Sequence, residues 1–142
     1  MGLKQIDHGS ADYWKMVQLR LKILRQPLGL DFSEEELLKE KNDILIAAFD
    51  EDKLMGCCVL CKNGDDSLRL RQMAVDVQMQ RNGIGASIIF FAENLARDKG
   101  YKKIIMHARQ TAVSFYEKFG FQKKGDEFYE LNLPHILMEK SL

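Results

Sequence analysis

The segment Gln80-Arg81-Asn82-Gly83-Ile84-Gly85-Ala86 contains the residues best suited to bind an anion. It directly follows a β-rich run and opens an apolar pattern of helical period. The first turn of a helix leaves its backbone N–H groups unpaired and carries a partial positive charge. Glycines let that backbone approach an anion closely, and Arg81 adds a guanidinium. The segment therefore predicts a pyrophosphate pocket, although Gly-x-Gly at a helix start can also be no more than a tight turn.

Three phosphorylated cofactors could use such a loop. A nucleotide-binding P-loop needs Gly-Lys-Ser/Thr at its end, and Ile84-Gly85-Ala86 offers none of these. A dinucleotide fingerprint needs a third glycine where Ile88 stands and an acid about 20 residues on. The next predicted strand instead ends at His107. Coenzyme A is the candidate that remains.

A second motif, Ser114-Phe115-Tyr116-Glu117-Lys118-Phe119-Gly120-Phe121, lies some way after the loop. The two motifs in this order resemble those of the GNAT superfamily of acetyltransferases. The residues that carry the resemblance are Gln80, Gly83 and Gly85 in the first motif, and Ala112, Phe115, Tyr116, Gly120 and Phe121 in the second. The resemblance implies an N-acetyltransferase that uses acetyl-CoA as cosubstrate and needs no metal.

The end of the chain resembles a narrower group within that superfamily. Members of this group of small proteins often carry Glu-Phe followed by Pro-His-x-x-Met, as Glu127-Phe128 and Pro134-His135-Ile136-Leu137-Met138 do here. The stretch from Leu24 to Gly29 looks like theirs too. The acceptors of this group are poorly known, so the resemblance implies an unspecified primary amine of a small molecule or a peptide.

The resemblance also implies roles for individual residues. Tyr116 would be the general acid that protonates the leaving thiolate, and a phenol of pKa about 10 is protonated at neutral pH. The alternative is an aromatic residue that only packs beside the cofactor. Lys118 could contact a CoA phosphate or be solvated. The residues expected to bind acetyl-CoA are Met73, Ala74, Val75, Gln80, Arg81, Asn82, Gly83, Ile84, Gly85, Ala86 and Lys118.

An attacking amine must lose a proton, because an alkyl ammonium of pKa about 10.4 is mostly charged at neutral pH. His135, His107 and Glu127 are candidate bases, and each could equally be a structural or solvated residue. A water chain could replace a dedicated base. Many superfamily members carry an Asn after the fifth strand, where this chain has Arg109 and Gln110 instead.

These residues need a mixed α/β domain to position them, and the sequence predicts one domain over residues 1–142. We expect a central sheet of about six to seven strands flanked by about four helices. Ser10 and Ser33 are expected helix caps, and the long helix runs from Gly83 to Gly100. The fourth helix is expected over 111–119. The expected strands are 44–49, 54–61, 68–75, 103–106, one near Phe121 and 136–138.

Composition excludes several classes of protein. Lys plus Arg and Asp plus Glu each number 21, so the chain lacks the basic excess typical of nucleic-acid binders. No apolar run is long enough to span a bilayer, and the first residues lack the apolar core of a signal peptide. The three cysteines Cys57, Cys58 and Cys61 are too clustered for a disulfide framework or a zinc site. We therefore expect a cytoplasmic protein with reduced cysteines and no nucleic-acid or membrane partner.

Three questions stay open at the level of sequence. A non-catalytic acyl-CoA-binding or sensor domain would keep the same loop, although retention of Tyr116 favours an enzyme. A homodimer is possible, since the apolar strands between Ile44 and Cys61 could hide an edge. The acidic stretch 31–40 could attract a cationic amine or could be a solvated helix face.

Overall fold

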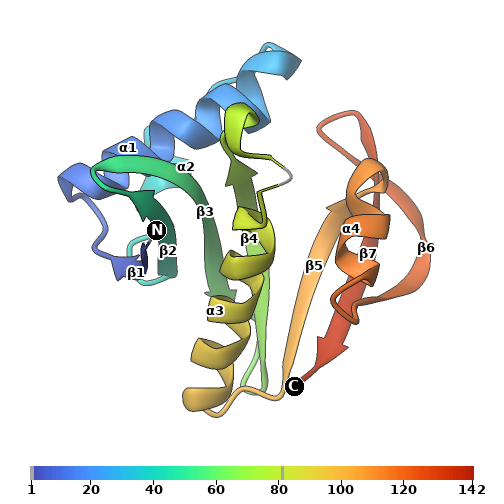
Figure 1. The fold of residues 1–142 in the computed structure, drawn as a ribbon. Coiled ribbons are helices and arrows are strands. Elements are labelled where there is room, and N and C mark those ends of the chain that lie inside the picture. Colours follow the sequence, from blue (N-terminus) through green and yellow to red (C-terminus); the bar gives the residue numbers. More distant parts are fainter. Residues whose placement is uncertain (1, 81) are drawn as a thin grey trace.

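Seven strands form one mixed sheet in the order β1-β2-β3-β4-β5-β7-β6 in a computed structural model that describes residues 2–80 and 82–142 (Figure 1). Neighbouring strands are antiparallel except for β4 and β5, which are parallel. The strands are β1 (Gly2–Ile6), β2 (Ile44–Asp50), β3 (Lys53–Lys62), β4 (Ser67–Val75), β5 (Lys103–Arg109), β6 (Gln122–Glu130) and β7 (Leu133–Ser141). The α-helices are α1 (Ala11–Arg20), α2 (Glu34–Leu38), α3 (Ile84–Asp98) and α4 (Val113–Glu117). This arrangement confirms the predicted fold class.

The predicted helix caps are both present. Ser10 Oγ accepts a hydrogen bond from the Tyr13 amide at 3.1 Å, and Ser33 Oγ accepts one from the Glu36 amide at 3.1 Å. Such caps satisfy donors that the first turn leaves unpaired. Beyond α1 the chain continues as the π-helical turn η1 (Leu21–Arg25) and the 3₁₀ turn η2 (Gln26–Leu28), because Pro27 cannot extend an α-helix.

Four strands differ from the expectation, and β5 and β7 differ only in length, because they cover Lys103–Arg109 and Leu133–Ser141 rather than 103–106 and 136–138. β1 was not predicted, because a five-residue edge strand that is mostly exposed shows no clear apolar alternation. β6 is a nine-residue strand, and most of its side chains are exposed, so the sequence predicted only a strand near Phe121. Leu131 and Asn132, with φ of 50° and 62°, form the tight turn that joins β6 to β7.

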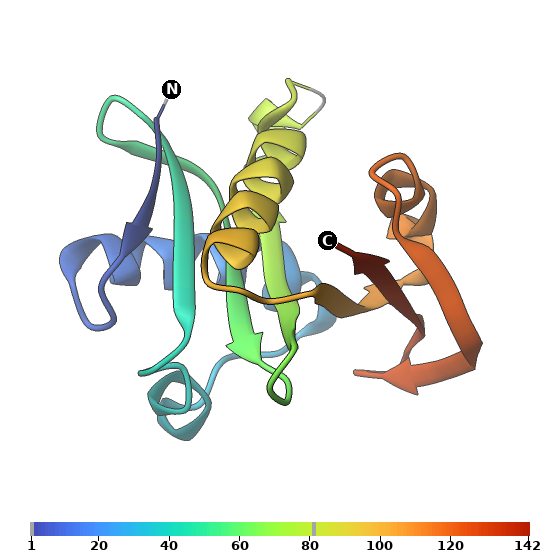
Figure 2. The same cartoon turned by 90° about the horizontal axis from the view of Figure 1, so that it is seen from below.

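Each face of the sheet has its own hydrophobic core. Figures 1 and 2 show α3 on one face and α1 on the other. Cys58 of β3 belongs to the core beneath α3 and α4, and the adjacent Cys57 belongs to the core beneath α1. Because successive strand residues point to opposite faces, two neighbouring cysteines fill two separate cores. Both are free thiols, as is Cys61.

The strands between Ile44 and Cys61 do not form an edge. β2 pairs with β1 and β3, and β3 pairs with β2 and β4. The sheet edges are β1 and β6. The argument that these apolar strands hide an edge in a dimer is therefore wrong, since burial in the centre of the sheet already explains their composition.

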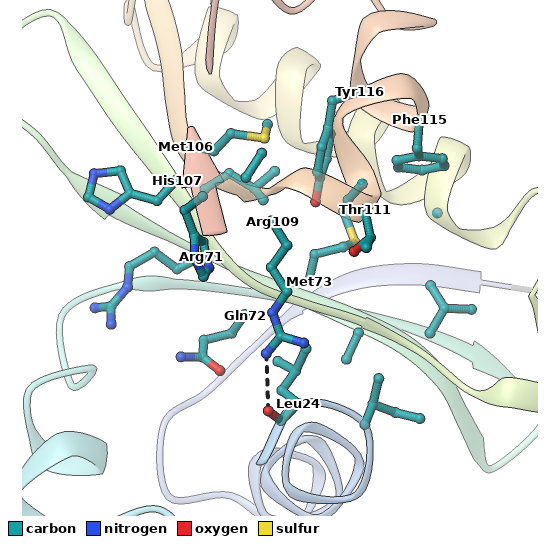
Figure 3. Close-up of a pocket in the computed structure, with 18 of the residues that line it drawn as sticks. Leu24, Arg71, Gln72, Met73, Met106, His107, Arg109, Thr111, Phe115 and Tyr116 are labelled. Atoms are coloured by element: carbon teal, nitrogen blue, oxygen red, sulfur yellow. Dashed lines mark hydrogen bonds between the residues drawn. The ribbon is translucent and has the colours of Figure 1, made fainter. Parts of the chain in front are cut away.

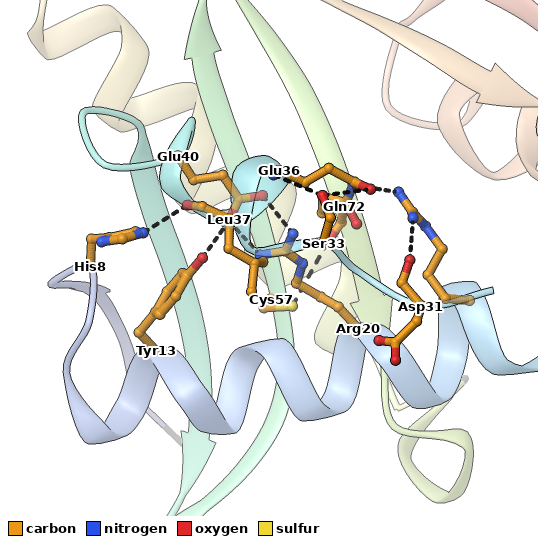
Figure 4. A network of polar contacts seen from close by, with 11 residues as sticks. His8, Tyr13, Arg20, Asp31, Ser33, Glu36, Leu37, Glu40, Cys57 and Gln72 are labelled. Atoms are coloured by element: carbon orange, nitrogen blue, oxygen red, sulfur yellow. Dashed lines mark hydrogen bonds and ion pairs between the residues drawn. The ribbon is translucent and has the colours of Figure 1, made fainter.

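A buried ion pair joins α1 to the segment after α2 (Figure 4). Arg20 donates to both carboxylate oxygens of Glu40, at 2.8 and 2.6 Å, and the Tyr13 hydroxyl donates to Glu40 at 2.8 Å. Arg20 is fully buried, and Glu40 is 5% exposed. This bidentate contact sets the position of α1 over the sheet, and α1 leads into one wall of the cavity described next.

Candidate functional site

Strands β4 and β5 separate from one another halfway along their length. Their parallel pairing ends at Leu70 and Met106. Further along, β4 stays paired with β3 on its other side, and β5 stays paired with β7. A cavity of about 870 Å³ lies at the resulting divergence. Among the described residues, the edge of β4 that faces β5 therefore presents backbone N–H and C=O groups without a strand partner at this point.

A bulge in β4 changes which side chains face which core. Gln72 has a φ of 55°, and the register between β3 and β4 shifts at this point. Before the bulge, Arg69 and Arg71 point away from the core beneath α3. After it, Met73 packs against that core and Ala74 against the core beneath α1. The two arginines before the bulge thus lie on the α1-facing side of the cavity, and the bulge redirects the side chains at the end of β4.

The glycine loop opens α3 beside this cavity. Gly83 is the N-cap residue with a φ of 78°, which glycine adopts without strain. The amides of Ile84, Gly85 and Ala86 belong to the first helical turn and lack intrahelical partners. A Cβ on Gly85 would lie 2.9 Å from Phe115 Cζ, so a glycine is needed where α3 meets α4. Arg81 lies outside the described residues.

Tyr116 of α4 lines the cavity from the side of α3. Its side chain is 7% exposed and packs against Phe115 and Phe121, with ring centroids 5.2 and 6.0 Å away. Figure 3 shows its hydroxyl directed into the cavity near Thr111. Burial, with a smaller effect of the Cys58 thiol, raises the pKa of Tyr116 above its usual value. The phenol is therefore protonated throughout the physiological pH range and can donate a proton.

On the opposite face of the sheet, His107 lies between a cation and an anion. Its Nδ1 is 2.9 Å from Nη2 of Arg69 and 2.5 Å from Oε1 of Glu130. A protonated Nδ1 donates to the carboxylate, whereas an unprotonated Nδ1 accepts from the guanidinium. In the first arrangement the neutral ring keeps Nε2 as a proton acceptor.

His135 shares this face, because it is paired across the strands with Arg109. Its Nδ1 donates to the Leu133 carbonyl at 2.8 Å, which leaves Nε2 of the neutral ring as a proton acceptor. Phe128 lies between the two histidines, 5.1 Å from His107 and 6.0 Å from His135 between ring centroids. The cavity therefore has a buried phenol on the α3 side and two histidines on the α1 side.

The structure brings together part of the predicted site. The predicted residues that line the cavity are Met73, Ala74, Val75, Gln80, Gly85, His107, Tyr116 and His135. The predicted residues outside its lining are Asn82, Gly83, Ile84, Ala86, Lys118 and Glu127. Glu127 is exposed and accepts a hydrogen bond from Gln110 at 3.0 Å. Lys118 is exposed as well.

Sequence reasoning missed Arg69, Arg71 and Glu130, which also line the cavity. The sequence did contain a signal for the two arginines. Residues two apart in a strand point to the same face, and two charges on one face of a predicted central strand are unusual. Glu130 had no local signal, because only the β6–β7 hairpin brings it beside His107.

Two further properties concern metals and membranes. Among residues 2–80 and 82–142, no group of three or more His, Cys, Asp or Glu side chains is arranged to hold a metal ion. Every helix in the same ranges is too short or too polar to span a bilayer.

Comparison with known proteins identifies the fold family. Residues 28–142 match the family described as "Acetyltransferase (GNAT) domain". The chain belongs to the GNAT acetyltransferase family. The matched range includes β2 to β7 and both sequence motifs of the GNAT domain. Ile23, Leu24 and Arg25, which line the cavity from η1, precede it.

Relatives and solved structures agree with this assignment. The protein YyaT of Bacillus subtilis is 30% identical over 74 residues, which are 52% of this chain and 50% of YyaT. The chain spans about half the length of the curated relatives it matches. An aminoglycoside 6'-N-acetyltransferase complexed with coenzyme A has a TM-score of 0.82 at 22% identity, over 99% of this chain and 97% of that one. Escherichia coli ElaA has a TM-score of 0.83 at 16% identity, over 99% of both chains. At these identities the two structures show a shared GNAT fold.

Proposed function

We propose that this GNAT protein is an N-acetyltransferase that moves an acetyl group from acetyl-CoA to a primary amine of a small molecule or a peptide. The observation that carries the proposal is one cavity that joins three features. These features are the unpaired edge of β4, the glycine start of α3 and the buried Tyr116 hydroxyl. Several similar structures contain coenzyme A or acetyl-CoA, which supports the choice of cosubstrate.

The described residues fit coenzyme A in two respects. The edge formed by Met73, Ala74 and Val75 has no strand partner on the side of β5, although Gln80 Nε2 donates to the Val75 carbonyl at 3.2 Å. This edge offers strand-like hydrogen bonds to a chain of amides such as pantetheine. The first-turn amides from Ile84 to Ala86 offer donors to a pyrophosphate. A Cβ at Gly83 would meet no protein atom, so the space outside this turn is open. The bound cosubstrate would supply an activated thioester.

In this proposal Tyr116 is the general acid. The leaving sulfur would arrive from the α3 side, where the Tyr116 hydroxyl lies. No described residue hydrogen-bonds to this hydroxyl. A buried phenol whose pKa is raised stays protonated until it donates. The alternative, an aromatic residue that only packs beside the cofactor, does not need the hydroxyl.

The proton acceptor for the amine belongs on the α1-facing side. His135 fits this role because its Nδ1 is engaged by Leu133, so that Nε2 is the basic nitrogen. His107 fits for the same reason when Glu130 accepts its Nδ1 proton. Glu127 is separated from the cavity lining, so the proposal assigns it no proton transfer. The variants His135→Gln and His107→Gln would show which histidine lowers turnover when it is removed.

Calorimetric titration with acetyl-CoA tests the cofactor site. Gly83→Val should abolish saturable binding, because a β-branched residue disfavours a φ of 78° and changes the first turn of α3. Gly64→Val is the matched control, since Gly64 has a φ of 79° and equally open surroundings in the turn before β4. A folded wild-type protein without saturable binding would refute the proposed function.

An acyl-CoA-binding or sensor domain is the alternative function. Release of free CoA thiol upon addition of amines separates the two functions, because a sensor binds acetyl-CoA without turnover. Saturable binding combined with no thiol release for any class of amine would favour the sensor.

The proposal includes a cytoplasmic location, membership of the Pro-His-x-x-Met group and a homodimer. Free thiols at Cys57, Cys58 and Cys61 suit a reducing compartment. Pro134 to Met138 lies in β7, where His135 lines the cavity. The exposed edge strand β6 could pair with a second copy. Sedimentation at two protein concentrations tests the homodimer, and a single monomer species would contradict it.

A further inference from the structure

Basic side chains dominate the α1-facing part of the cavity. Glu130 is the one Asp or Glu among the described residues that line it. Four arginines line the same cavity, namely Arg25, Arg69, Arg71 and Arg109. They come from η1, β4 and β5, so tertiary structure gathers them from separate parts of the chain. A ligand in this region meets a positive field.

Two of these arginines each form an ion pair with a carboxylate. The pairs are Arg25 with Glu36 at 3.1 Å and Arg69 with Glu130 at 3.9 Å. Glu36 is partly exposed and does not line the cavity. Among the described residues, Arg71 and Arg109 form no ion pair with a carboxylate.

Arg109 has no carboxylate partner among the described residues. It extends from β5 across the cavity, and its Nη2 donates to the Leu24 carbonyl at 3.1 Å (Figure 3). Burial and the nearby charge of Arg25 lower the pKa of Arg109. A partly buried guanidinium that faces a like charge and has only a carbonyl partner is stabilised when an anion binds beside it.

Arg69 supplies a second, independent observation. Its Nε is buried without a hydrogen-bond partner in the described part of the chain. Burial and the charge of Arg71 lower the pKa of Arg69 as well. Among the described residues, Arg69 Nε thus has no acceptor and Arg109 has a single carbonyl acceptor, so both guanidinium groups can donate further hydrogen bonds to an anion.

The acidic stretch 31–40 offsets only the charge of Arg25 in this cavity. Glu36 is engaged by Arg25, and Glu40 is engaged by Arg20 in the buried pair. Glu34 and Glu35 are exposed and lie outside the cavity lining. The sequence-based suggestion that these acids attract a cationic amine therefore has no support at the cavity.

We infer that the acceptor amine also carries an oxyanion, either a carboxylate or a phosphate, which Arg109 binds. A guanidinium presents parallel N–H groups that match both oxyanions. The inference rests on the proposed function and names the substrate class for it. Arg109 acts as a binding residue that orients the acceptor on the α1-facing side, opposite Tyr116.

Matched pairs of amines test the inference on the full chain saturated with CoA, which prevents turnover. The pairs are amino acids against their carboxamides, and O-phosphoethanolamine against ethanolamine. Calorimetry should show that at least one oxyanion-bearing member binds about 10-fold or more tightly than its partner without the oxyanion, as expected for a charge-assisted contact. Spermidine and kanamycin represent polycationic acceptors.

The variant Arg109→Gln should remove this preference. Arg97→Gln is the matched control, because Arg97 is exposed on α3 outside the cavity, and the preference should persist in it. Arg25→Gln is a second test that leaves the contact between Arg109 and Leu24 in place, and it should weaken the preference. Thermal unfolding confirms that each variant is folded.

Several outcomes would overturn the inference. These are binding of polycations alone, equal binding within every pair, no binding of any oxyanion-bearing amine, and an unchanged preference in Arg109→Gln. Loss of acetyl-CoA binding in folded Arg109→Gln would also overturn it, because the arginine would then serve the cofactor. A parallel titration of the wild type with acetyl-CoA separates failure of this inference from failure of the proposed function.

Discussion

At the scale of single residues, the Tyr116 hydroxyl is the most specific chemical feature of the cavity. Tyr116→Phe should lower kcat about 10-fold or more, because the leaving thiolate loses its proton donor. Acetyl-CoA affinity should change little, since the ring remains. Steady-state turnover and calorimetry of the same preparation measure both quantities.

The thermal stability of Tyr116→Phe should match that of the wild type, because no described residue hydrogen-bonds to this hydroxyl. Phe115→Leu, which changes the adjacent ring, is the control for packing. Unchanged kcat in Tyr116→Phe at every pH tested would refute the assignment of Tyr116 as the general acid.

The cysteines provide a second prediction at this scale. Burial raises the pKa of Cys57 to about 12 and that of Cys58 well above its usual value. Because thiolates are the reactive form, neither should react with an aromatic disulfide reagent at pH 8 until the protein unfolds.

The same shifts affect stability. Unfolded thiols ionise above about pH 8.5 whereas the folded ones stay neutral, so the free energy of unfolding should fall as pH rises beyond that point. Urea titrations at pH 7 and pH 10 measure the change. Rapid reaction of all three thiols in the folded protein would contradict the prediction.

At the scale of elements, the start of α3 and the helix α4 are coupled through Gly85 and Phe115. Gly85→Ala should destabilise the protein by about 1–3 kcal/mol, because the new Cβ would lie 2.9 Å from the Phe115 ring. Urea unfolding measures the effect. In a Phe115→Leu background the same substitution should lower the free energy of unfolding by less. An equal loss in both backgrounds would show that the contact with Phe115 does not cause the destabilisation.

The buried ion pair beneath α1 is the second prediction at this scale. Glu40→Ala should cost about 3–5 kcal/mol of folding free energy, since it leaves the fully buried Arg20 without a counterion. Glu36→Ala should cost under about 1 kcal/mol, because the Glu36 side chain is 45% exposed. Similar costs for the two variants would show that burial does not control the difference.

At the scale of the whole molecule, ligand binding should bridge the two halves of the sheet. Acetyl-CoA at 100 times its Kd should stabilise the protein by about 2.7 kcal/mol, which thermal unfolding detects. Hydrogen exchange should slow at residues 73–75 and 84–86, where the unpaired amides would gain acceptors. Protection confined to α1 and α2 would place the cosubstrate elsewhere.

The sequence by itself determined most of the elements and the family. The capping serines, the glycines at the start of α3 and the strand periodicities are local signals, because each reflects backbone conformation within a few residues. The Gly-x-Gly loop and the Phe-Tyr motif together indicated the GNAT family, and residues 28–142 confirm it. Strand β1 was not predicted, because an exposed edge strand carries no apolar pattern.

Only the tertiary structure decided what the cavity contains. The separation of β4 from β5 and the bulge at Gln72 depend on pairing between distant strands, so no local pattern encodes them. The same pairing places Arg109 opposite η1 and Glu130 beside His107. Arginines that look solvated along the chain therefore line one basic cavity once the sheet forms, because burial and proximity are properties of the folded chain.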